Sequence, residues 1–426
     1  MNYIEKLIQE KCPNGVKYKK LNEIGDFYGG LTGKSKDDFK NGNCKFISYM
    51  NIYKNPALDI DNIEETVCVS ENEKQNKAEY GDILFTGSSE TPDECAISSV
   101  ITKYPTENLY LNSFCFGYRL KDISIFLPDF LKHLLRDSFF RKQVPMAVNG
   151  VTRFNVSKTE LGKIEIPVPP IEIQREIVKV LDNFSELTAE LTAELSARKQ
   201  QYEYYRNQLL DFGTPEKAKN CEWKPLNDCI ISLNTGLNPR KFFRLNTNDA
   251  EGYYVTIREL KNNRIVFNDK TDRINEEARI LCNNRSNLEV GDVLFSGTGT
   301  IGETALIEEK PLNWNVKEGI YSIKPQKDII LPKFLLYILH SKEVEFSYME
   351  KRCGGTVQSV PMRDLRNIYI PIPSLEKQRE IVNKLDQFDK LVNDLTEGLP
   401  AEIEARQKQY EYYRNKLLTF KRLETN

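Results

Sequence analysis

The sequence predicts an α+β fold built twice in one chain, with two globular domains and two long helices. The chain of 426 residues is too long for one core, because a domain takes about 150 residues. The segment IPVPPIEIQREIVKVLDNF at 166–184 recurs as IPIPSLEKQREIVNKLDQF at 370–388. Apolar residues in and after these blocks return every three or four positions, which is the period of a helix.

Further landmarks repeat in the same order along the two halves of the chain. A second block, QYEYYRNQLLDF at 201–212, returns as QYEYYRNKLLTF at 409–420. Shorter matches pair GDILFTGSS at 81–89 with GDVLFSGTG at 291–299, and LPDFLKHLL at 127–135 with LPKFLLYIL at 331–339. A period this long indicates the duplication of whole domains, because solenoid repeats are much shorter.

The order of elements follows from these landmarks. Segments 1–165 and 213–369 mix short β-type runs such as CKFISYMNI and FCFGYRL with helical runs such as FLPDFLKHLLRDSFF, so each predicts a compact α+β domain. Segments 166–212 and 370–426 predict the helical regions. We expect the first helix to run from about 170 to 211, after the proline-rich IPVPP entry. Gly398 and Pro400 predict a kink or restart in the second copy.

The apolar stripe of each helix admits two interpretations. A single helix of this kind usually packs on its own domain. A helix of about 40 residues is on the order of 60 Å long and extends beyond an ordinary domain. Its own duplicate has a matching length and stripe, which favours a paired coiled coil within a pseudo-twofold duplication.

Composition excludes several classes of protein. With 60 basic against 62 acidic residues, 29% charged and 40% hydrophobic, the chain has the composition of a soluble globular protein and has no basic tail. Any DNA binding must come from cations gathered on one face, and partners would have to add grip on phosphates. Nine scattered cysteines indicate reduced thiols. Without a signal peptide or an apolar span, we expect a cytoplasmic protein.

The sequence contains few motifs of catalytic sites, and one segment only superficially resembles a phosphate-binding loop. GGLTGKS at 29–35 misplaces the first glycine of a phosphate-binding loop, and its counterpart GLNPR at 236–240 keeps only glycine, leucine and a cation. A turn that presents Lys34 or Arg240 to a phosphate is the better interpretation. His133 and His340 do not align with each other, so we predict no metal site and no serine triad. The sequence lacks an N/D-P-P-Y/W motif and an F-x-G-x-G loop, so nothing predicts an enzyme acting alone.

The paired blocks resemble the repeated regions of Type I restriction-modification specificity subunits. The resemblance lies in the I-P-[IV]-P-x-x-E-x-Q opening at 166–184 and 370–388, in the Q-Y-E-Y-Y-R segments, and in G-D-[IV]-L-F before a small-residue turn. It covers essentially the whole chain.

The resemblance implies a non-catalytic subunit of a methyltransferase/endonuclease complex active in phage defence. The two globular domains would be target recognition domains, each reading one half of a bipartite asymmetric site in double-stranded DNA. The helical regions would pack antiparallel and hold the domains apart. The partners implied are two methyltransferase subunits, which carry S-adenosylmethionine, and two motor-nuclease subunits. This chain itself would bind no cofactor.

Family members can hold tandem T-A-E-L units in the central helix, and this chain reads ELTAELTAEL at 186–195. Each four-residue unit adds ~6 Å of helix. That length is comparable to one or two base-pair steps of ~3.4 Å. We therefore expect the number of units to set the gap between the half-sites.

Candidate DNA-binding residues are polar loop residues near the repeat landmarks, because amides, hydroxyls and arginine forks read base edges while lysines hold phosphates. For any one of them, the alternative is a solvated loop residue. In the first domain they are Lys34, Ser35, Ser88, Ser89, Asn112, Asn149, Thr152, Arg153 and Asn155. In the second they are Arg240, Arg244, Thr298, Thr300, Asn315, Lys317, Thr356, Gln358 and Ser359.

Candidate subunit-interface residues lie on the helices. Their alternatives are capping or solvation of the first turn for the glutamines and arginines, and burial between helices and domains for the tyrosines. These residues are Gln174, Arg175, Tyr202, Tyr205, Gln378, Arg379, Tyr410 and Tyr413.

Other functions stay open at this stage. The chief rival is an assembly scaffold that binds proteins and no DNA, and an orphan or phage-borne specificity subunit is a milder variant. Loops that differ between the two domains on a matched frame favour a reader of two different half-sequences. An enzyme acting through GGLTGKS is the weakest alternative.

Overall fold

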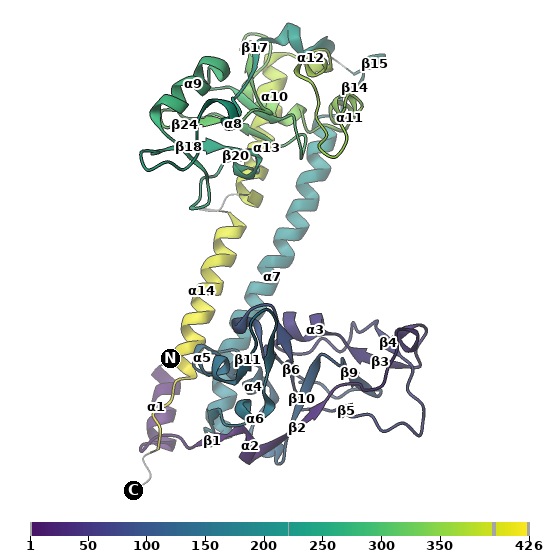
Figure 1. The fold of residues 1–426 in the computed structure, drawn as a ribbon, viewed down its shortest axis with the longest axis vertical. Coiled ribbons are helices and arrows are strands. Elements are labelled where there is room, and N and C mark those ends of the chain that lie inside the picture. The colour runs from purple at the N-terminus through teal and green to yellow at the C-terminus, as the bar shows by residue number, and fades with distance from the viewer. Residues whose placement is uncertain (1, 220, 394–397, 424–426) are drawn as a thin grey trace. The chain divides into compact units, whose positions relative to one another are not determined.

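The computed structural model describes residues 2–219, 221–393 and 398–423, with the side chains of residues 2, 240 and 241 left aside. They form two compact units (Figure 1). Unit 1 comprises Met1–Leu191 and Ile403–Asn426, and unit 2 comprises Thr192–Glu402. Each unit thus combines one globular head with parts of both helical regions. We name residues 18–167 head 1 and residues 222–372 head 2.

Each head is built around a four-stranded antiparallel sheet of the same strand order. In head 1 the strands are β2 (Gly25–Gly29), β10 (Cys115–Leu120), β6 (Ile83–Thr86) and β8 (Ser98–Val100). In head 2 they are β17 (Ile230–Thr235), β25 (Ile320–Pro325), β22 (Val293–Ser296) and β23 (Thr304–Leu306). Ile83 and Phe85 of β6 enter one apolar cluster and Leu84 enters another. Because alternate side chains point to opposite faces, the run is apolar throughout and buried on both sides.

Smaller sheets complete each head. Both heads contain a parallel pair, β3 (Cys44–Ile47) with β9 (Leu109–Leu111) and β18 (Gly252–Val255) with β24 (Trp314–Val316). Antiparallel neighbours extend these pairs, namely β4 (Thr66–Val67), β5 (Lys77–Ala78) and β21 (Arg273–Ile274). Further short strands of the heads are β7 (Ser88–Ser89), β11 (Val148–Asn149), β12 (Phe154–Val156), β19 (Leu260–Lys261) and β20 (Arg264–Ile265). Strands β14 (Gly213–Thr214) and β15 (Lys217–Ala218) lie in the segment before head 2.

Each head is closed by a two-stranded ribbon that joins its entry to its exit. In head 1, β1 (Tyr18–Lys20) pairs antiparallel with β13 (Glu165–Pro167). In head 2, β16 (Glu222–Pro225) pairs antiparallel with β26 (Tyr369–Ile372). The chain therefore enters and leaves each head at neighbouring points.

Each unit also contains short helices. Unit 1 has α1 (Asn2–Lys11), α2 (Leu21–Ile24), α3 (Tyr49–Lys54), α4 (Pro128–Leu134), α5 (Ser138–Gln143) and α6 (Lys158–Leu161). Unit 2 has α8 (Pro239–Phe242), α9 (Glu276–Ser286), α10 (Pro332–Ile338), α11 (Lys342–Met349) and α12 (Met362–Arg366). Short 3₁₀ helices lie at Lys36–Phe39, Pro92–Glu94, Ile123–Ile125, Val144–Ala147, Leu226–Cys229 and Ile257–Glu259. Both α4 and α10 begin at a proline, whose fixed φ and missing N–H suit a first turn.

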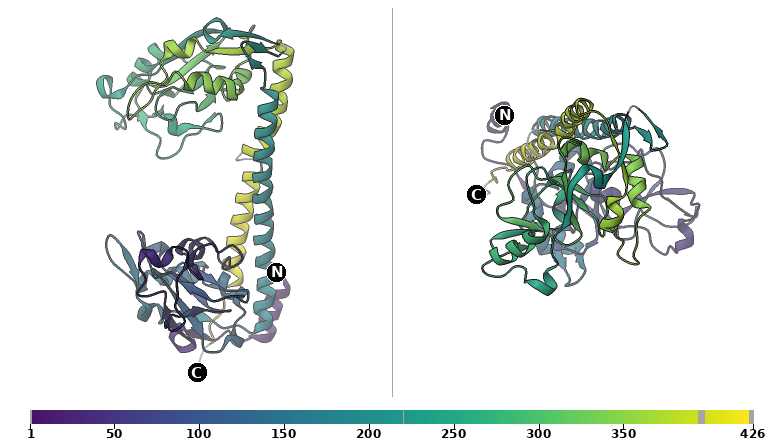
Figure 2. Two further views of the ribbon diagram at one scale, coloured as in Figure 1. Left: turned by 90° about the vertical axis from the view of Figure 1, so that its right-hand side faces the viewer. Right: turned by 90° about the horizontal axis from the view of Figure 1, so that it is seen from above.

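The helical regions form α7 (Ile171–Leu209), α13 (Leu375–Asn393) and α14 (Leu399–Leu417). The separate start of α14, with Pro400 in its first turn, confirms the predicted restart. Within unit 1, Phe184 of α7 stacks on Tyr413 of α14 with ring centroids 5.2 Å apart. Within unit 2, Tyr205 of α7 stacks on Phe388 of α13 at 5.4 Å. As the residue number along α7 rises from 184 to 205, the number of the contacted residue falls from 413 to 388, which confirms the predicted antiparallel pairing of the helical regions. Figure 2 draws these helices as ribbons.

Two buried glutamines join the helices to the heads. The Gln174 side-chain oxygen accepts from the Leu127 N–H at 2.8 Å, and its amide nitrogen donates to the carbonyls of Ile125 and Pro169. Gln378 makes the matching bonds, accepting from the Leu331 N–H and donating to Ile329 and Pro373. Both glutamines are fully buried. Because every side-chain amide group is engaged inside the chain, the prediction that they belong to a subunit interface is wrong.

All nine cysteines are free thiols. Over the described residues, no helix combines the length and the apolar character needed to cross a membrane.

Candidate nucleic-acid interface

Head 1 carries a polar pocket of about 570 Å³ beside the end of strand β6. It is lined by Tyr49, Ser88, Ser89, Glu90, Phe114, Thr152 and Arg153. The Tyr49 hydroxyl donates to the Ser88 carbonyl at 3.0 Å, and burial raises the pKa of Tyr49. The phenol therefore stays protonated at neutral pH and acts as a donor.

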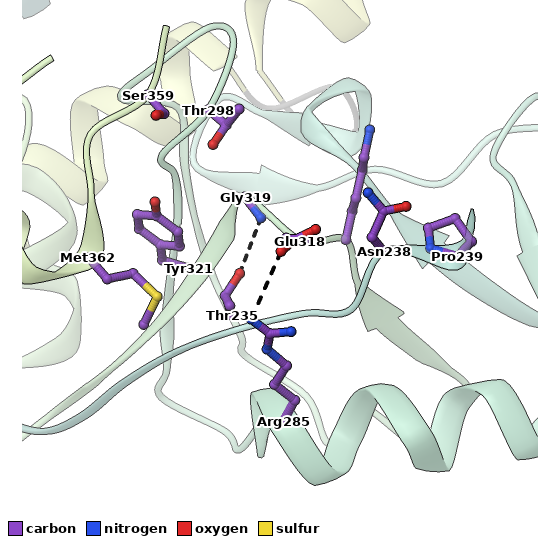
Figure 3. Close-up of a pocket in the computed structure, with 11 residues that line it drawn as sticks. Thr235, Asn238, Pro239, Arg285, Thr298, Glu318, Gly319, Tyr321, Ser359 and Met362 are labelled. Carbon is purple, nitrogen blue, oxygen red and sulfur yellow. Dashed lines mark hydrogen bonds and ion pairs between the residues drawn. The ribbon is translucent and has the colours of Figure 1, made fainter. Parts of the chain in front are cut away.

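Head 2 carries a pocket of about 590 Å³ (Figure 3). Its rim combines hydroxyls, an amide and charges, contributed by Thr235, Asn238, Arg285, Thr298, Lys317, Glu318 and Ser359. Tyr321 and Met362 supply apolar surface. The Thr235 hydroxyl accepts from the Gly319 N–H at 3.1 Å, and Arg285 lies 3.9 Å from the Glu318 carboxylate.

The two pockets lie at equivalent positions of the two duplicated heads. In head 1, Ser88 follows β6 and pairs with Asn155. In head 2, Thr298 follows β22 and bridges to Ser359. The turn before β10 supplies Phe114 to the first pocket, and the turn before β25 supplies Lys317 and Glu318 to the second. The frame is therefore common while the lining differs.

Seven of the candidate DNA-binding residues gather in these pockets. They are Ser88, Ser89, Thr152 and Arg153 in head 1, and Thr298, Lys317 and Ser359 in head 2. Asn149 and Asn155 flank the first pocket on β11 and β12. The Asn112 side chain accepts from the Phe114 N–H at 2.8 Å and so shapes the turn that presents Phe114. Thr356 and Gln358 are exposed beside Ser359.

Two candidates are engaged inside the fold. Asn315 is 1% exposed and its side chain bonds to Ser286 and to the Val316 N–H. The Lys34 ammonium, with a side chain 8% exposed, donates to the Cys68 carbonyl and to Glu73, both at 2.6 Å. Their burial contradicts a direct DNA contact, and both residues hold loops together.

The remaining candidates lie outside the pockets. Ser35 bonds to Asp38 within its own turn, and Arg244 and Thr300 are exposed. Arg240 lies in α8, and its side chain falls outside the described residues. DNA contact by these residues stays a prediction.

Sequence reasoning missed several pocket residues. Glu90 directly follows the GDILFTGSS landmark, and Phe114 follows Asn112 by two positions, so a search of landmark neighbours finds both. Arg285 comes from α9, which ends before the GDVLFSGTG landmark, so it lies outside the landmarks at which candidate residues were chosen.

The aromatic clusters on the long helices divide into inward and outward members. Tyr202 is buried, and the Tyr410 hydroxyl lies 2.9 Å from a ring nitrogen of His133, whose other nitrogen lies 2.7 Å from Asp182. Burial lowers the pKa of His133, so the ring is neutral at pH 7. The most exposed members are Tyr204 (59%) and Tyr412 (61%), which stand at matching positions of the two Q-Y-E-Y-Y-R segments, whereas Tyr205 is 37% exposed. Arg175 and Arg379 are also exposed.

No group of three or more His, Cys, Asp or Glu side chains suited to a metal ion occurs within the described residues. His340 is engaged by the Thr304 hydroxyl at 2.7 Å and by the Asn263 side chain at 3.2 Å, and burial lowers its pKa to about 4. Both histidines are therefore satisfied interior residues.

The family model for the Type I restriction modification DNA specificity domain matches residues 13–198 and again residues 221–405. The chain belongs to this family. The two matches fall on the two halves of the duplication, and the family is one of specificity subunits, in agreement with the predicted non-catalytic role.

Curated family members include the Type I restriction enzyme EcoR124I/EcoR124II specificity subunit of Escherichia coli, 36% identical over 278 residues. The match covers 63% of this chain and 66% of that protein, just under two thirds of its length. A putative type I restriction enzyme specificity subunit of Haemophilus influenzae is 33% identical over 300 residues, which cover 68% of this chain and 72% of the relative.

Solved structures share the fold of this family member. A chain from a structure on complex assembly and conformational transition of the type I R-M system has a TM-score of 0.62 at 19% identity, covering 95% of this chain and 98% of that one. The S subunit of a type I restriction-modification system from M. genitalium has a TM-score of 0.51 at 15% identity, covering 96% and 98%.

Proposed function

We propose that this chain is the sequence-reading subunit of a Type I restriction-modification complex. Each head reads one half of a bipartite, asymmetric target in double-stranded DNA, through the pocket beside β6 in head 1 and the pocket beside β22 in head 2. The observation that carries the proposal is that these pockets lie at equivalent positions of the two heads but are lined by different residues. Different donors and acceptors on a common frame suit two different half-sequences.

The charge of the chain fits a reader that works in a complex. At a formal net charge of −2, the isolated subunit lacks the excess of cations that drives non-specific binding to phosphates. Partner subunits supply that grip. We assign no cofactor to this chain, because S-adenosylmethionine belongs to the methyltransferase partner.

The test is selection from a pool of duplexes with a randomised segment, using the subunit assembled with its methyltransferase. We expect one consensus of two defined half-sites separated by a fixed gap. The chain alone should bind weakly and lose binding as salt rises. Equal recovery of every sequence by the complex contradicts the proposal and favours a protein scaffold that does not read DNA.

The gap between half-sites is set by the helices in this proposal. The two T-A-E-L units at 188–195 lie within α7. Deletion of residues 192–195 removes ~6 Å of helix and should shorten the preferred gap by about one or two base pairs with both half-sequences retained. The matched control Thr192→Ala keeps the helix length and should keep the gap. Altered half-sequences in the deletion variant would count against this role.

Recruitment of two methyltransferase subunits is assigned to the exposed tyrosines Tyr204 and Tyr412. Each stands on a long helix at a repeated position, so two copies of one partner protein meet the same local surface twice. Exposed tyrosines are frequent anchors of protein interfaces. Tyr204→Ala and Tyr412→Ala should each weaken methyltransferase binding about tenfold, measured by titration calorimetry.

Tyr104→Ala is the control for that measurement. Its side chain is as exposed as those of the two helix tyrosines, but it lies in a loop of head 1. Binding lost equally in all three variants would contradict the assignment. Two motor-nuclease subunits complete the proposed cytoplasmic complex.

A further inference from the structure

We infer that Arg153 is the residue of head 1 that selects a guanine in its half-site. This inference rests on the proposed function, because it assigns one base to one side chain of the same pocket. It combines the geometry of a hairpin, the support of the guanidinium and the contrast with head 2.

A tight hairpin positions Arg153 at the pocket. Strands β11 and β12 pair antiparallel, and residues 150–153 form the connecting loop. Gly150 has φ +132°, and a Cβ at this position would lie 2.1 Å from the Arg153 carbonyl oxygen. Only glycine permits so close an approach of the backbone. The next residue, Phe154, pairs with Ser89, so Arg153 lies beside the end of β7.

The guanidinium is supported on two sides while keeping donors available. Its Nη2 donates to the Ser88 hydroxyl at 3.3 Å, and its central carbon lies 5.6 Å from the centroid of the Phe114 ring. Among the described contacts of Arg153, none is to a carboxylate. An arginine held on an aromatic ring loses less side-chain entropy when it forms a planar pair of bonds.

Guanine presents the two hydrogen-bond acceptors that match the paired N–H donors of an arginine side chain. Its O6 and N7 atoms are adjacent acceptors in the major groove, and arginine binds both through two parallel N–H donors. The surroundings suit a base edge better than a phosphate. Phe114, whose ring faces the guanidinium, is 59% exposed, and Val151 in the same hairpin loop as Arg153 is 91% exposed, so apolar surface is available at this site. Apolar groups gain from contact with bases and with the thymine methyl, whereas phosphates are strongly hydrated.

Head 2 has no equivalent of this arginine. The pairing of Asn155 with Ser88 and of Thr298 with Ser359 places Val357 at the position of Arg153. The arginine of the head 2 pocket, Arg285, comes from a different element and has Glu318 at 3.9 Å. Guanine selection by the hairpin is therefore a property of head 1 alone.

The experiment repeats the selection from randomised duplexes with Arg153→Ala and Arg153→Lys in the assembled methyltransferase complex. Lysine keeps the charge but loses the planar fork. We expect both variants to lose the preference for guanine at one position of the head 1 half-site by about tenfold to a hundredfold, with the head 2 half-site unchanged. The unchanged half-site also reports that the variant is folded. Arg352→Ala, which removes an exposed cation beside the Cys353–Ser359 bridge of head 2, should leave the head 1 half-site intact.

Three results overturn the inference. One is an unchanged consensus in both variants. Another is binding weakened alike for every sequence, down to complete loss, which identifies a phosphate contact. The third is a wild-type head 1 half-site without guanine. By contrast, a wild-type complex that selects no bipartite consensus at all refutes the proposed function itself, so the two failures are distinguishable.

Discussion

Head 1 and head 2 agree in their central sheets, their closing ribbons and the bonds of their buried glutamines, and differ in the residues that line their pockets. The central sheets have the same strand order, the closing ribbons match, and Gln174 and Gln378 make the same three bonds. The pockets share a position, yet one presents Arg153 on Phe114 and the other presents Lys317 with the Arg285–Glu318 pair.

This difference shows that burial constrains the residues that join the heads to the helices but not the residues at the pocket rims. A buried amide that leaves its partners unbonded costs free energy in either head, so the frame tolerates little change. A loop residue at the pocket rim carries no such cost. Residues at the pocket rims can therefore differ between the heads while the buried residues that hold each head on its helix stay the same.

The largest expected effect tests whether Gln174 and Gln378 contribute equally to the stability of the protein. Gln174→Leu and Gln378→Leu keep side-chain volume but leave one buried N–H and two carbonyls without their partner. We expect each to lower the free energy of unfolding by at least about 3 kcal/mol, measured by urea denaturation. The neighbouring exposed variants Arg175→Ala and Arg379→Ala should stay within about 0.5 kcal/mol. Unequal losses between the two glutamine variants would break the comparison.

A second prediction exploits a difference at matched helix starts. Asp137 caps α5, whereas Ser341 stands at the start of α11. Burial raises the pKa of Asp137 to about 6 from the usual 3.8. The folded carboxyl thus keeps its proton to a higher pH than the unfolded one, so stability is fully present below about pH 4 and falls as the pH rises towards 6.

A shift of this size corresponds to at most about 3 kcal/mol. Asp137→Asn should abolish this fall in the free energy of unfolding between pH 4 and pH 6, followed by denaturant titration at each pH. Ser341→Ala is the control in unit 2 and should keep the wild-type pH dependence. A wild-type slope retained in Asp137→Asn would refute the assignment.

A smaller effect is expected where Tyr337 stands at the position of His133. The Tyr337 hydroxyl donates to Asp386 at 2.7 Å, and Asp386 also receives Lys333 at 2.8 Å. Tyr337→Phe removes one bond to a charged group and should cost about 1.5 kcal/mol of stability. Tyr204→Phe, whose exposed hydroxyl accepts only from Gln208 among the described contacts, is the control and should change little. Equal effects would show that the Asp386 bond contributes nothing.

The smallest effect sharpens the contrast between the pockets. Arg285 and Glu318 are each about half exposed, so their ion pair contributes little to folding. Glu318→Gln should change the free energy of unfolding by less than about 0.5 kcal/mol. If this pocket faces DNA as proposed, the same substitution removes a negative charge from it and should tighten DNA binding of the complex at low salt, measured by fluorescence anisotropy. A loss of affinity would contradict the assignment of this pocket to DNA.

The sequence predicted the long helices, the restart before α14 and the duplicated heads, because periodicity and repetition are local properties. It failed at Gln174 and Gln378, since a helical period does not tell which turn of the helix meets a head. Asn112 follows β9 and shapes an exposed turn, whereas Asn315 lies within β24 and is buried beside Ser286 of α9. The shared residue type therefore did not reveal their different surroundings.

The tyrosine clusters show the same limit. Three aromatic residues within Q-Y-E-Y-Y-R cannot share one face, because successive helical residues are rotated by about 100°. The sequence indicated that some must face outward. Only the packing of His133, Phe184 and Phe388 identifies Tyr204 and Tyr412 as those residues.

The closing ribbons have a further consequence for how such chains diversify. Because β1 lies beside β13, and β16 beside β26, the first and last strands of each head are neighbours. Each head is therefore attached to the rest of the chain at two adjacent points. A different domain whose two ends have the same spacing can replace a head at these strands without disturbing the rest of the chain, as domain insertion generally requires. Recombination at these ribbons would give an organism a new specificity in a single genetic event.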